Sequence, residues 1–359
     1  MASITSAWAV TPHSCSRGVR RSWLGPGRQG PVVSDVLILH VADSALEPIY
    51  SEIIGALNER GIASDFFSAD RPFEDQFAGK VVVIDIGGWG RAEHVAAGKA
   101  AGVQLWQVVG YGLDHLALDE VMASGIPLAR IPGSSTAIAL AEHAMYLLLA
   151  VVKQANLARP ALMEQHFFDG DALELDGRTI AIVGLGASGR ELARRASGFG
   201  MRVIGVDVVA VSPADQAAIG VERCESIDRL HEVLAEADVV SLHLPLNSAT
   251  RHVLNAGAFQ AMKAGAIVVN VARGQLIDEA ALVDALKTGH LGGAGLDVFE
   301  VEPLPLNSPL LSMPNVVVTP HWAAATRATM ERRAQITANN VRLALDGGPA
   351  EHLVRLADL

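Results

Sequence analysis

The stretch RTIAIVGLGASGRELARRASGFG (residues 178–200) decides the fold of the larger part of this chain. An apolar run typical of a buried strand leads through three glycines into a segment with helical spacing. Gly184 permits the tight turn, Gly186 lets the backbone approach a pyrophosphate, and Gly189 allows the helix to pack close to the strand. The free N–H groups at the start of that helix favour phosphate groups. The stretch therefore predicts a dinucleotide-binding strand–turn–helix unit.

The next predicted strand, MRVIGVD (201–207), indicates which dinucleotide binds. It ends in Asp207, 23 residues after Gly184, where a carboxylate can accept hydrogen bonds from the adenosine ribose. The 2′-phosphate of NADP would meet a like charge there, and residues 208–210 include no arginine to hold it. The sequence therefore predicts NAD rather than NADP. The motif alone leaves one alternative open, an ordinary glycine turn followed by a surface Asp.

Strand and helix patterns alternate on both sides of this unit. The earlier series has short β runs at 32–42, 62–67, 81–87, 103–110 and 126–132, and helical stretches at 45–60, 91–101 and 114–124. A long Ala/Leu-rich helix follows, from Thr136 to about Ala158. The later series has β runs at 237–245, 266–272, 292–298 and 315–321, and a last helix at 326–345. Repeated strand–helix units predict parallel sheets, so we expect an α/β protein with two doubly wound parallel-sheet domains.

The composition excludes several classes of protein. Half of the 359 residues are hydrophobic and only 5% are aromatic, which suits an α/β enzyme better than an all-β fold. No run reaches the ~18 apolar residues of a membrane span. The net charge of −11 argues against nucleic-acid binding. The two cysteines, Cys15 and Cys224, cannot form a disulfide framework and indicate a reducing compartment.

The N-terminal residues 1–32 follow no strand or helix period. They are rich in Ser, Arg and Gly, and the first acidic residue of the chain is Asp35. Such a composition is typical of an organelle transit peptide, and equally of a disordered N-terminal extension. We favour the disordered extension, and with it a cytoplasmic protein.

Three polar residues follow predicted strands downstream of the glycine motif, at the sheet edge where open α/β folds bind ligands. Arg273 ends AIVVNVAR, Glu302 follows GLDVFEV, and His321 ends NVVVTPH. Arg273 suits the carboxylate of a 2-oxo acid, because a guanidinium binds it with two hydrogen bonds. His321 suits the proton donor, and Glu302 would stabilise its protonated form and fix the ring. Taken singly, Arg273 is more typical of a solvated ion-pair partner, Glu302 of a loop residue and His321 of a structural histidine.

The chain resembles the D-isomer-specific 2-hydroxyacid dehydrogenase family, whose members include glyoxylate/hydroxypyruvate reductases and phosphoglycerate dehydrogenases. The resemblance extends from about residue 35 to 357. It is carried by VGYGLDH (109–115), ALAEHAMYLLLA (139–150), IAIVGLGASGRELA (180–193), SLHLPLNSATRHVLN (241–255), VVNVARGQLIDEAALVDAL (268–286), GAGLDVFEVEP (293–303) and TPHWAAAT (319–326).

The resemblance implies a role for each matching position. Arg273 would orient the substrate, and Glu302 and His321 would form the acid/base pair. Backbone N–H groups of Gly88, Trp89, Gly90 and Tyr111 would bind the substrate carboxylate beside Arg273. The implied cofactor contacts are Gly184, Gly186, Ala187, Ser188, Gly189, Asp207, Pro245, Thr250, Val271, Ala272, Arg273, Asp297, His321 and Ala324.

Several positions depart from the pattern of the family. Ala187 and Ser188 replace the usual basic residue and Ile of the glycine loop, and Thr136 replaces a frequent Asn. Glu302 stands where formate dehydrogenases of the family carry Gln, which argues against formate oxidation. We expect the C-terminal regulatory domain of longer phosphoglycerate dehydrogenases to be absent.

These observations predict an NAD-dependent D-2-hydroxyacid dehydrogenase that works as a 2-oxo acid reductase. A flavodoxin-like substrate domain would comprise residues 33–132 and 327–359, and a Rossmann domain residues 133–326. The family implies a homodimer. No His/Cys spacing predicts a metal site. Two alternatives stay open, an NAD-sensing regulator without enzymatic activity and a dehydrogenase of another donor such as phosphite.

The identity of the substrate is not predicted. Trp89, Tyr111 and Thr136 are candidates for shaping its pocket. Arg91 would meet a second anionic group or, as we favour, would be a surface residue at the start of a helix.

Overall fold

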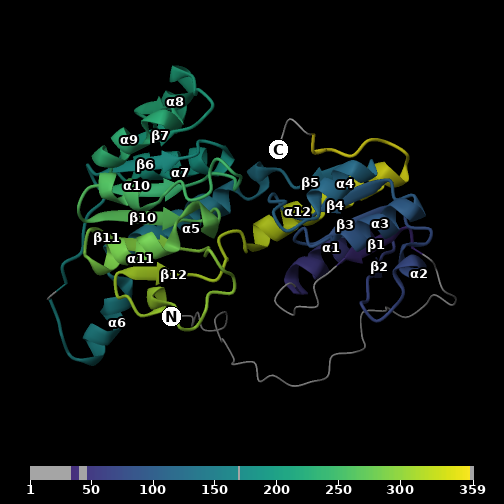
Figure 1. Ribbon diagram of the computed structural model, residues 1–359, viewed down its shortest axis with the longest axis horizontal. Helices are drawn as coiled ribbons and strands as arrows, with labels where there is room; N and C mark the ends of the chain where they lie inside the picture. Colours follow the sequence, from purple (N-terminus) through teal and green to yellow (C-terminus); the bar gives the residue numbers. More distant parts are fainter. Residues whose placement is uncertain (1–33, 40–46, 169, 356–359) are drawn as a thin grey trace, which may run out of the picture. The chain divides into compact units, whose positions relative to one another are not determined.

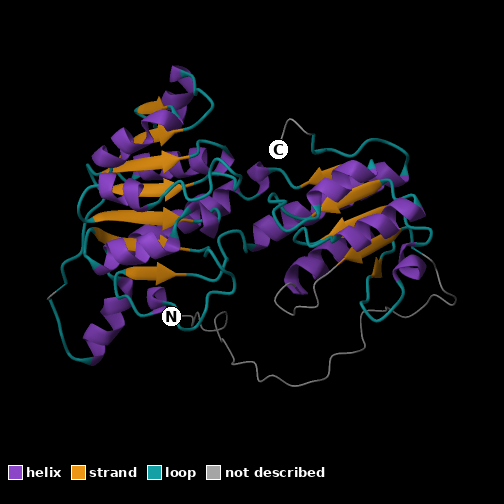
Figure 2. Ribbon diagram, viewed as in Figure 1, coloured by secondary structure: helices purple, strands orange, loops and turns teal. Residues whose placement is uncertain are grey.

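The computed structural model describes residues 34–39, 47–168 and 170–355 (Figure 1). The predicted extension at 1–32 lies outside these residues. The described part contains two sheets, one of five strands and one of seven, and every pair of neighbouring strands is parallel. Helices cover both faces of each sheet (Figure 2). The predicted class, α/β with two doubly wound sheets, is confirmed.

The five-stranded sheet has the strand order β2-β1-β3-β4-β5, which is the flavodoxin order. Its strands are β1 (Val36–Leu39), β2 (Asp65–Phe66), β3 (Val82–Asp85), β4 (Leu105–Val108) and β5 (Leu128–Arg130). The helices between them are α1 (Glu47–Glu59), α2 (Phe73–Phe77), α3 (Ala92–Ala101) and α4 (Leu118–Ser124).

The seven-stranded sheet has the order β12-β11-β10-β9-β6-β7-β8, in which the strand order reverses next to β6 as in a Rossmann fold. Its strands are β6 (Thr179–Val183), β7 (Arg202–Val206), β8 (Arg223–Glu225), β9 (Val239–Leu242), β10 (Ala266–Asn270), β11 (Leu291–Leu296) and β12 (Val316–Val318). Its helices include α7 (Ala187–Gly198), α8 (Pro213–Ile219), α9 (Leu230–Glu236), α10 (Ala256–Ala261) and α11 (Glu279–Lys287).

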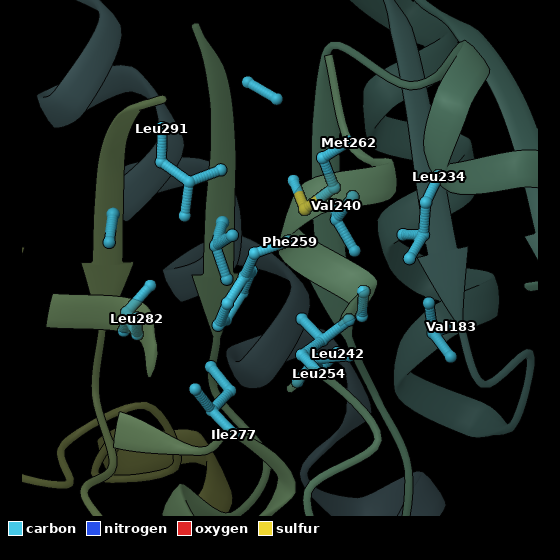
Figure 3. Close-up of a cluster of buried hydrophobic side chains, with 14 of the residues drawn as sticks. Val183, Leu234, Val240, Leu242, Leu254, Phe259, Met262, Ile277, Leu282 and Leu291 are labelled. Atoms are coloured by element: carbon cyan, nitrogen blue, oxygen red, sulfur yellow. The ribbon is translucent and has the colours of Figure 1, made fainter. Parts of the chain in front are cut away.

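Burial along the central strands explains why these segments form strands. In β6, Ala181 and Val183 belong to one hydrophobic core, and Ile180 and Ile182 belong to the core on the opposite face. Figure 3 shows the first of these cores, with Phe259 of α10 between the strands and the covering helices. Side chains alternate along a strand, so a sheet covered on both faces needs continuous apolar runs.

The long helix predicted for 136–158 is two helices, so this prediction is wrong in its extent. It divides into α5 (Ala137–Val152) and α6 (Ala155–Met163), because Gln154 between them has φ 54°. The side chains of Lys153 and Gln154 donate hydrogen bonds to the carbonyl groups of Leu173 and Asp171, which hold this break. Among the described residues no single helix has the length and apolar character of a membrane span. Only α5 and α6 counted together have that length and apolar character, and the two helices are bent by 45° relative to each other.

The last helix, α12 (Arg327–Leu345), packs against the five-stranded sheet and not against the strands that precede it in sequence. Ala338 and Val341 lie in the same core as Ile53 of α1. The buried Asn340 amide donates to the side chain of Gln107 in β4 at 2.7 Å. The limits of the two domains, 33–132 with 327–359 and 133–326, stay a prediction.

Candidate active site

The glycine loop between β6 and α7 has the geometry that a dinucleotide needs. Gly184 has φ 101°, and a Cβ there would lie 2.5 Å from the carbonyl oxygen of His243. A Cβ on Gly189 would lie 1.9 Å from the oxygen of Gly184, so only glycine permits this packing of helix on strand. Gly186 is the N-cap of α7 and faces open space, and Ala187 is the first residue of that helix. This open helix start fits the pyrophosphate of a dinucleotide.

Asp207 stands directly after β7, beside the glycine loop. Its carboxylate accepts hydrogen bonds from the backbone N–H of Leu185 at 2.6 Å and of Val209 at 2.9 Å. The first bond fixes Asp207 against the glycine loop. The structure thus brings together the predicted pyrophosphate-binding and ribose-binding residues.

A histidine that the sequence did not single out holds the same loop. The Ser188 hydroxyl lies 3.0 Å from Nδ1 of His243, and the Ser241 hydroxyl lies 3.1 Å from its Nε2. Burial lowers the pKa of His243 to about 4, so the ring is neutral at physiological pH. A neutral ring accepts a hydrogen bond from one serine and donates to the other. The unusual Ser188 therefore has a polar partner that an Ile could not use.

Arg273 lies between the two sheets of the described chain. Its Nε donates to Asp114 at 2.7 Å, and its Nη1 donates to the carbonyl of Ala272 at 2.8 Å. Its Nη2 lies so close to Gly112 that a Cβ there would be 1.7 Å away. Asp114, in the loop after β4, is a partner that sequence reasoning missed, although it belongs to the quoted VGYGLDH segment. The pair leaves Nη2 without a described hydrogen-bond partner, available to a ligand.

Glu302 and His321 form the pair that the sequence predicted. Oε2 of Glu302 lies 2.8 Å from Nδ1 of His321, and its Oε1 accepts the N–H of Phe299 at 3.0 Å. Burial raises the pKa of Glu302, but the hydrogen bond and charge of His321 outweigh it and lower the pKa below its usual value. The Nδ1 of His321 is thereby occupied, which directs Nε2 of a half-exposed ring toward any ligand.

Asp297 holds the turn that carries His321. It is fully buried, and its carboxylate accepts the N–H groups of Trp322 and Ala323, each at 2.8 Å. The Thr319 hydroxyl donates to it at 2.6 Å and lies 2.8 Å from Nε2 of His143. Burial raises the pKa of Asp297, but His143, whose Nε2 lies 3.4 Å from the carboxylate, and these hydrogen bonds outweigh it and lower the pKa. In this structure the Asp297 carboxylate therefore holds the backbone next to His321 in place.

The remaining predicted cofactor residues lie in loops after strands of the same sheet. Thr250 donates its hydroxyl to the carbonyl of Pro245 at 2.7 Å, so these two residues are brought together. Ala272 donates its N–H to the side chain of Asn270 at 3.0 Å, in the segment with Val271 that follows β10. The carbonyl of Ala324 accepts the N–H of Thr326 in the turn before α12.

The resemblance assigns the amides of residues 88–90 to the substrate carboxylate. In this structure two of them donate to a carboxylate of the protein itself, and the assignment stays a prediction. The N–H groups of Trp89 and Gly90 each donate to the carboxylate of Asp85 at 2.9 Å. The indole of Trp106 donates to the same group at 3.0 Å. Burial raises the pKa of Asp85, although these hydrogen bonds oppose the shift. This aspartate ends β3, a position the sequence analysis had not considered.

The candidates for the substrate pocket differ in exposure. Tyr111 and Trp89 are 43% and 47% exposed, and the Trp89 ring stacks on His115 at 4.6 Å. Within the described residues the N–H of Tyr111 has no hydrogen-bond partner. Thr136 is buried and binds the carbonyl of Gly133, so it does not line a surface. Arg91 is the N-cap of α3, which agrees with the surface role that we favoured.

No group of three His, Cys, Asp or Glu side chains in the described part of the chain is arranged to hold a metal ion.

Comparisons with known proteins place this site in a family. The family model "D-isomer specific 2-hydroxyacid dehydrogenase, NAD binding domain" matches residues 145–323. D-3-phosphoglycerate dehydrogenase from Mycobacterium tuberculosis is 42% identical over 242 residues, which cover 66% of this chain and 44% of that relative. The matched part therefore spans less than half the length of that enzyme.

Two further relatives are covered over most of their length. (S)-sulfolactate dehydrogenase from Chromohalobacter salexigens is 39% identical over 240 residues, 66% of this chain and 76% of the relative. The crystal structure of TT0316 protein from Thermus thermophilus has a TM-score of 0.74 at 34% identity, covering 89% of this chain and 99% of its own. The glycine loop, the paired Glu302 and His321 and these matches agree, and the chain belongs to the D-isomer-specific 2-hydroxyacid dehydrogenase family.

Proposed function

We propose that the protein is an NAD-dependent D-2-hydroxyacid dehydrogenase that works as a 2-oxo acid reductase. The observation that carries this proposal is the 2.8 Å contact between Glu302 and His321, which follow β11 and β12 of the dinucleotide-binding sheet. The named activities of the relatives, on 3-phosphoglycerate and sulfolactate, support a 2-hydroxy acid as the substrate class.

The chain's own residues supply three functions in this reaction. Arg273 binds the substrate carboxylate through Nη2, and the free N–H of Tyr111 lies on the neighbouring loop. His321 donates a proton from Nε2 to the oxygen that becomes the hydroxyl, while Glu302 keeps the ring oriented and favours its protonated form. When bound, NADH supplies the hydride for the carbonyl carbon.

Several features support NAD over NADP as the cofactor. The Asp207 carboxylate is held against the glycine loop by Leu185, where a 2′-phosphate would meet a negative charge. Val208 and Val209 next to it are exposed and uncharged. The loop residues Gly184, Gly186, Ala187, Ser188 and Gly189 would hold the pyrophosphate. The rest of the dinucleotide would lie against Pro245, Thr250, Val271, Ala272, Arg273, His321 and Ala324, and Asp297 would act through the backbone that its carboxylate holds.

The substrate domain would comprise residues 33–132 and 327–359, and the cofactor domain residues 133–326. The packing of α12 on α1 and β4 supports the first of these. The packing of α5 on α7 and β11 supports the second.

A homodimer is the proposed assembly. Its support is an exposed apolar row on α5, where Ile138 and Tyr146 are 45% and 52% exposed, beside Trp322 at 62%. A hollow of about 490 Å³ lies along this row and is lined in part by Tyr146 and Trp322. We also propose a cytoplasmic location, because Cys224 is a free thiol and the sequence contains only two cysteines, which is typical of a reducing compartment.

A panel of 2-oxo acids, each assayed with NADH and with NADPH, tests the proposal. We expect NADH oxidation with at least one acid, a lower kcat/KM with NADPH, and loss of both rate and acid binding in Arg273→Ala. Tight NADH binding without turnover of any acid would contradict the enzymatic proposal. NAD reduction by phosphite without turnover of any hydroxy acid would contradict the substrate class.

A further inference from the structure

Arg130 ends β5, at the same edge of the five-stranded sheet as the loop that follows β4. Its guanidinium carbon lies 4.5 Å from the centre of the Tyr111 ring, and its Nη1 donates to the carbonyl of Tyr111 at 3.5 Å. Carboxyl edges of parallel strands are where open α/β sheets bind their ligands. Neither the glycine motif nor the predicted catalytic residues pointed to this arginine.

A second guanidinium reaches the same loop from the other sheet. Nη2 of Arg273 lies against Gly112, the residue next to Tyr111. Two arginines, from two different sheets, therefore contact adjacent residues of one loop. This shared loop is the observation that relates the two guanidinium groups.

The two arginines differ in their charge balance. Arg273 forms an ion pair with Asp114, whose carboxylate neutralises it in the absence of a ligand. No carboxylate among the described residues forms an ion pair with Arg130, whose guanidinium lies against the ring and carbonyl of Tyr111. A cation–π contact orients a guanidinium and leaves its charge in place.

Local packing holds both the backbone of Arg130 and the Tyr111 ring that its guanidinium contacts. Its backbone N–H donates to the carbonyl of His352 at 3.2 Å, which anchors the end of β5. The Tyr111 ring packs against Gly133, where a Cβ would lie 3.4 Å from the ring. A guanidinium that is already ordered loses little conformational entropy when it binds an anion.

We infer that Arg130 binds a second anionic group of the substrate. The substrate class is then a 2-oxo acid with two anionic ends: the carboxylate next to the carbonyl for Arg273, and a terminal carboxylate, phosphate or sulfonate for Arg130. This inference rests on the proposed function and narrows it. From the sequence, Arg91 was the candidate for binding a second anionic group. The inference assigns that role to Arg130 instead.

The test compares Arg130→Met, which keeps an unbranched apolar side chain and removes the charge, with Arg130→Lys and Arg91→Met. Oxaloacetate and 3-phosphohydroxypyruvate serve as substrates with two anionic groups, called dianionic here, and glyoxylate and pyruvate as substrates with one anionic group. We expect the wild type to have the higher kcat/KM on a dianionic acid. Arg130→Met should lower that value roughly 10- to 100-fold, mainly through KM, and at least tenfold more than for glyoxylate. Arg130→Lys should retain part of the preference, and Arg91→Met all of it.

Other results separate this inference from the proposed function. Equal losses on both substrate classes, together with a lower Tm, would make Arg130 a structural residue and overturn the inference. So would loss of the dianion preference in Arg91→Met, or a wild type that reduces glyoxylate and pyruvate better than either dianionic acid. A wild type that reduces no acid of either class would instead overturn the proposed function.

Discussion

Glu302 is the residue on which the proposed proton transfer depends most directly. Its lowered pKa means that it is ionised at neutral pH and faces His321 as a carboxylate. In Glu302→Gln the protonated imidazole loses this stabilising charge. We expect reductase kcat at pH 7 to fall about 10- to 100-fold, and the pH above which activity is lost to move to lower values.

A matched control for Glu302 lies two residues away. Glu300 forms a similar pair with His252, at 2.7 Å. Glu300→Gln should leave the pH–rate profile in place. A profile of Glu302→Gln that coincides with the wild-type profile would remove Glu302 from the mechanism.

His243 gives a pH dependence of stability. Its pKa is about 4 in the folded protein and about 6.5 in an unfolded chain. The unfolded state binds the additional proton between these values, so the stabilisation is complete above pH 6.5 and is lost as pH falls toward 4. We expect up to about 3 kcal/mol less free energy of unfolding at pH 4 than at pH 7 from this group.

Urea denaturation at several pH values measures this effect. His243→Gln should show a smaller loss of stability on acidification than the wild type, whereas exposed His231→Gln should match the wild type. Equal pH dependence in all three proteins would contradict the assignment.

For single residues, the sequence identified the site side chains better than it identified their hydrogen-bond partners. Arg273, Glu302 and His321 were identified because each follows an apolar strand and suits one chemical task. Asp114 was not, because its partner is distant in sequence: it binds Arg273 across 159 positions. Asp85 was not, because it is the last residue of an apolar strand and its bonds to the turn amides four and five residues further on depend on how that turn folds. The Asp85 carboxylate accepts hydrogen bonds from backbone amides that the family resemblance assigns to the substrate.

Among the elements, helix α12 carries two neighbouring arginines in opposite situations. Nε of Arg332 donates to the carbonyl of Ser135 at 2.9 Å. Nε of Arg333 is buried without a hydrogen-bond partner among the described residues, and burial together with the charge of Arg332 lowers its pKa to about 10. Arg333→Met should therefore raise the free energy of unfolding by about 1 kcal/mol. Arg332→Met should lower the free energy of unfolding by about 1 kcal/mol, because it removes a hydrogen bond.

Chemical denaturation of both α12 variants at one pH tests this pair. The two substitutions remove the same group from adjacent positions of one helix, so each is the control of the other. Shifts of the same sign would show that Arg333 has a stabilising partner.

Helices and strands were predicted well where the local apolar pattern determines their limits. They were predicted poorly where contacts with side chains of distant segments determine those limits. All strands of the seven-stranded sheet except the short β8 coincide with predicted apolar runs. The break between α5 and α6 was missed, because nothing in the apolar pattern shows that Gln154 bonds to the carbonyl of Asp171. Helices α8 to α11 are short and were not identified individually.

For the whole molecule, the exposed row on α5 predicts how two copies associate. Ile138 and Tyr146 lie two turns apart on one face of α5, so a twofold axis would place this face against its own copy. Glu142 between them forms an ion pair with Arg195 at 3.2 Å. Tyr146→Asp should convert a dimer to a monomer in sedimentation experiments, because it introduces a charge into an apolar contact. Phe199→Asp, at a similarly exposed apolar site elsewhere, should leave the dimer intact. A monomeric wild type would contradict the assembly.

The return of α12 to the first sheet has a consequence for synthesis on the ribosome. Arg60 after α1 binds Gln335 of α12 across 275 positions. At roughly 5–20 residues per second, translation separates these two residues by about 15–55 seconds. During that interval the face of β1, β3 and β4 that receives Ala338 and Val341 has no covering helix beyond α1. The five-stranded sheet therefore completes its core only after α12 has been made, and its apolar face is exposed on the nascent chain until then.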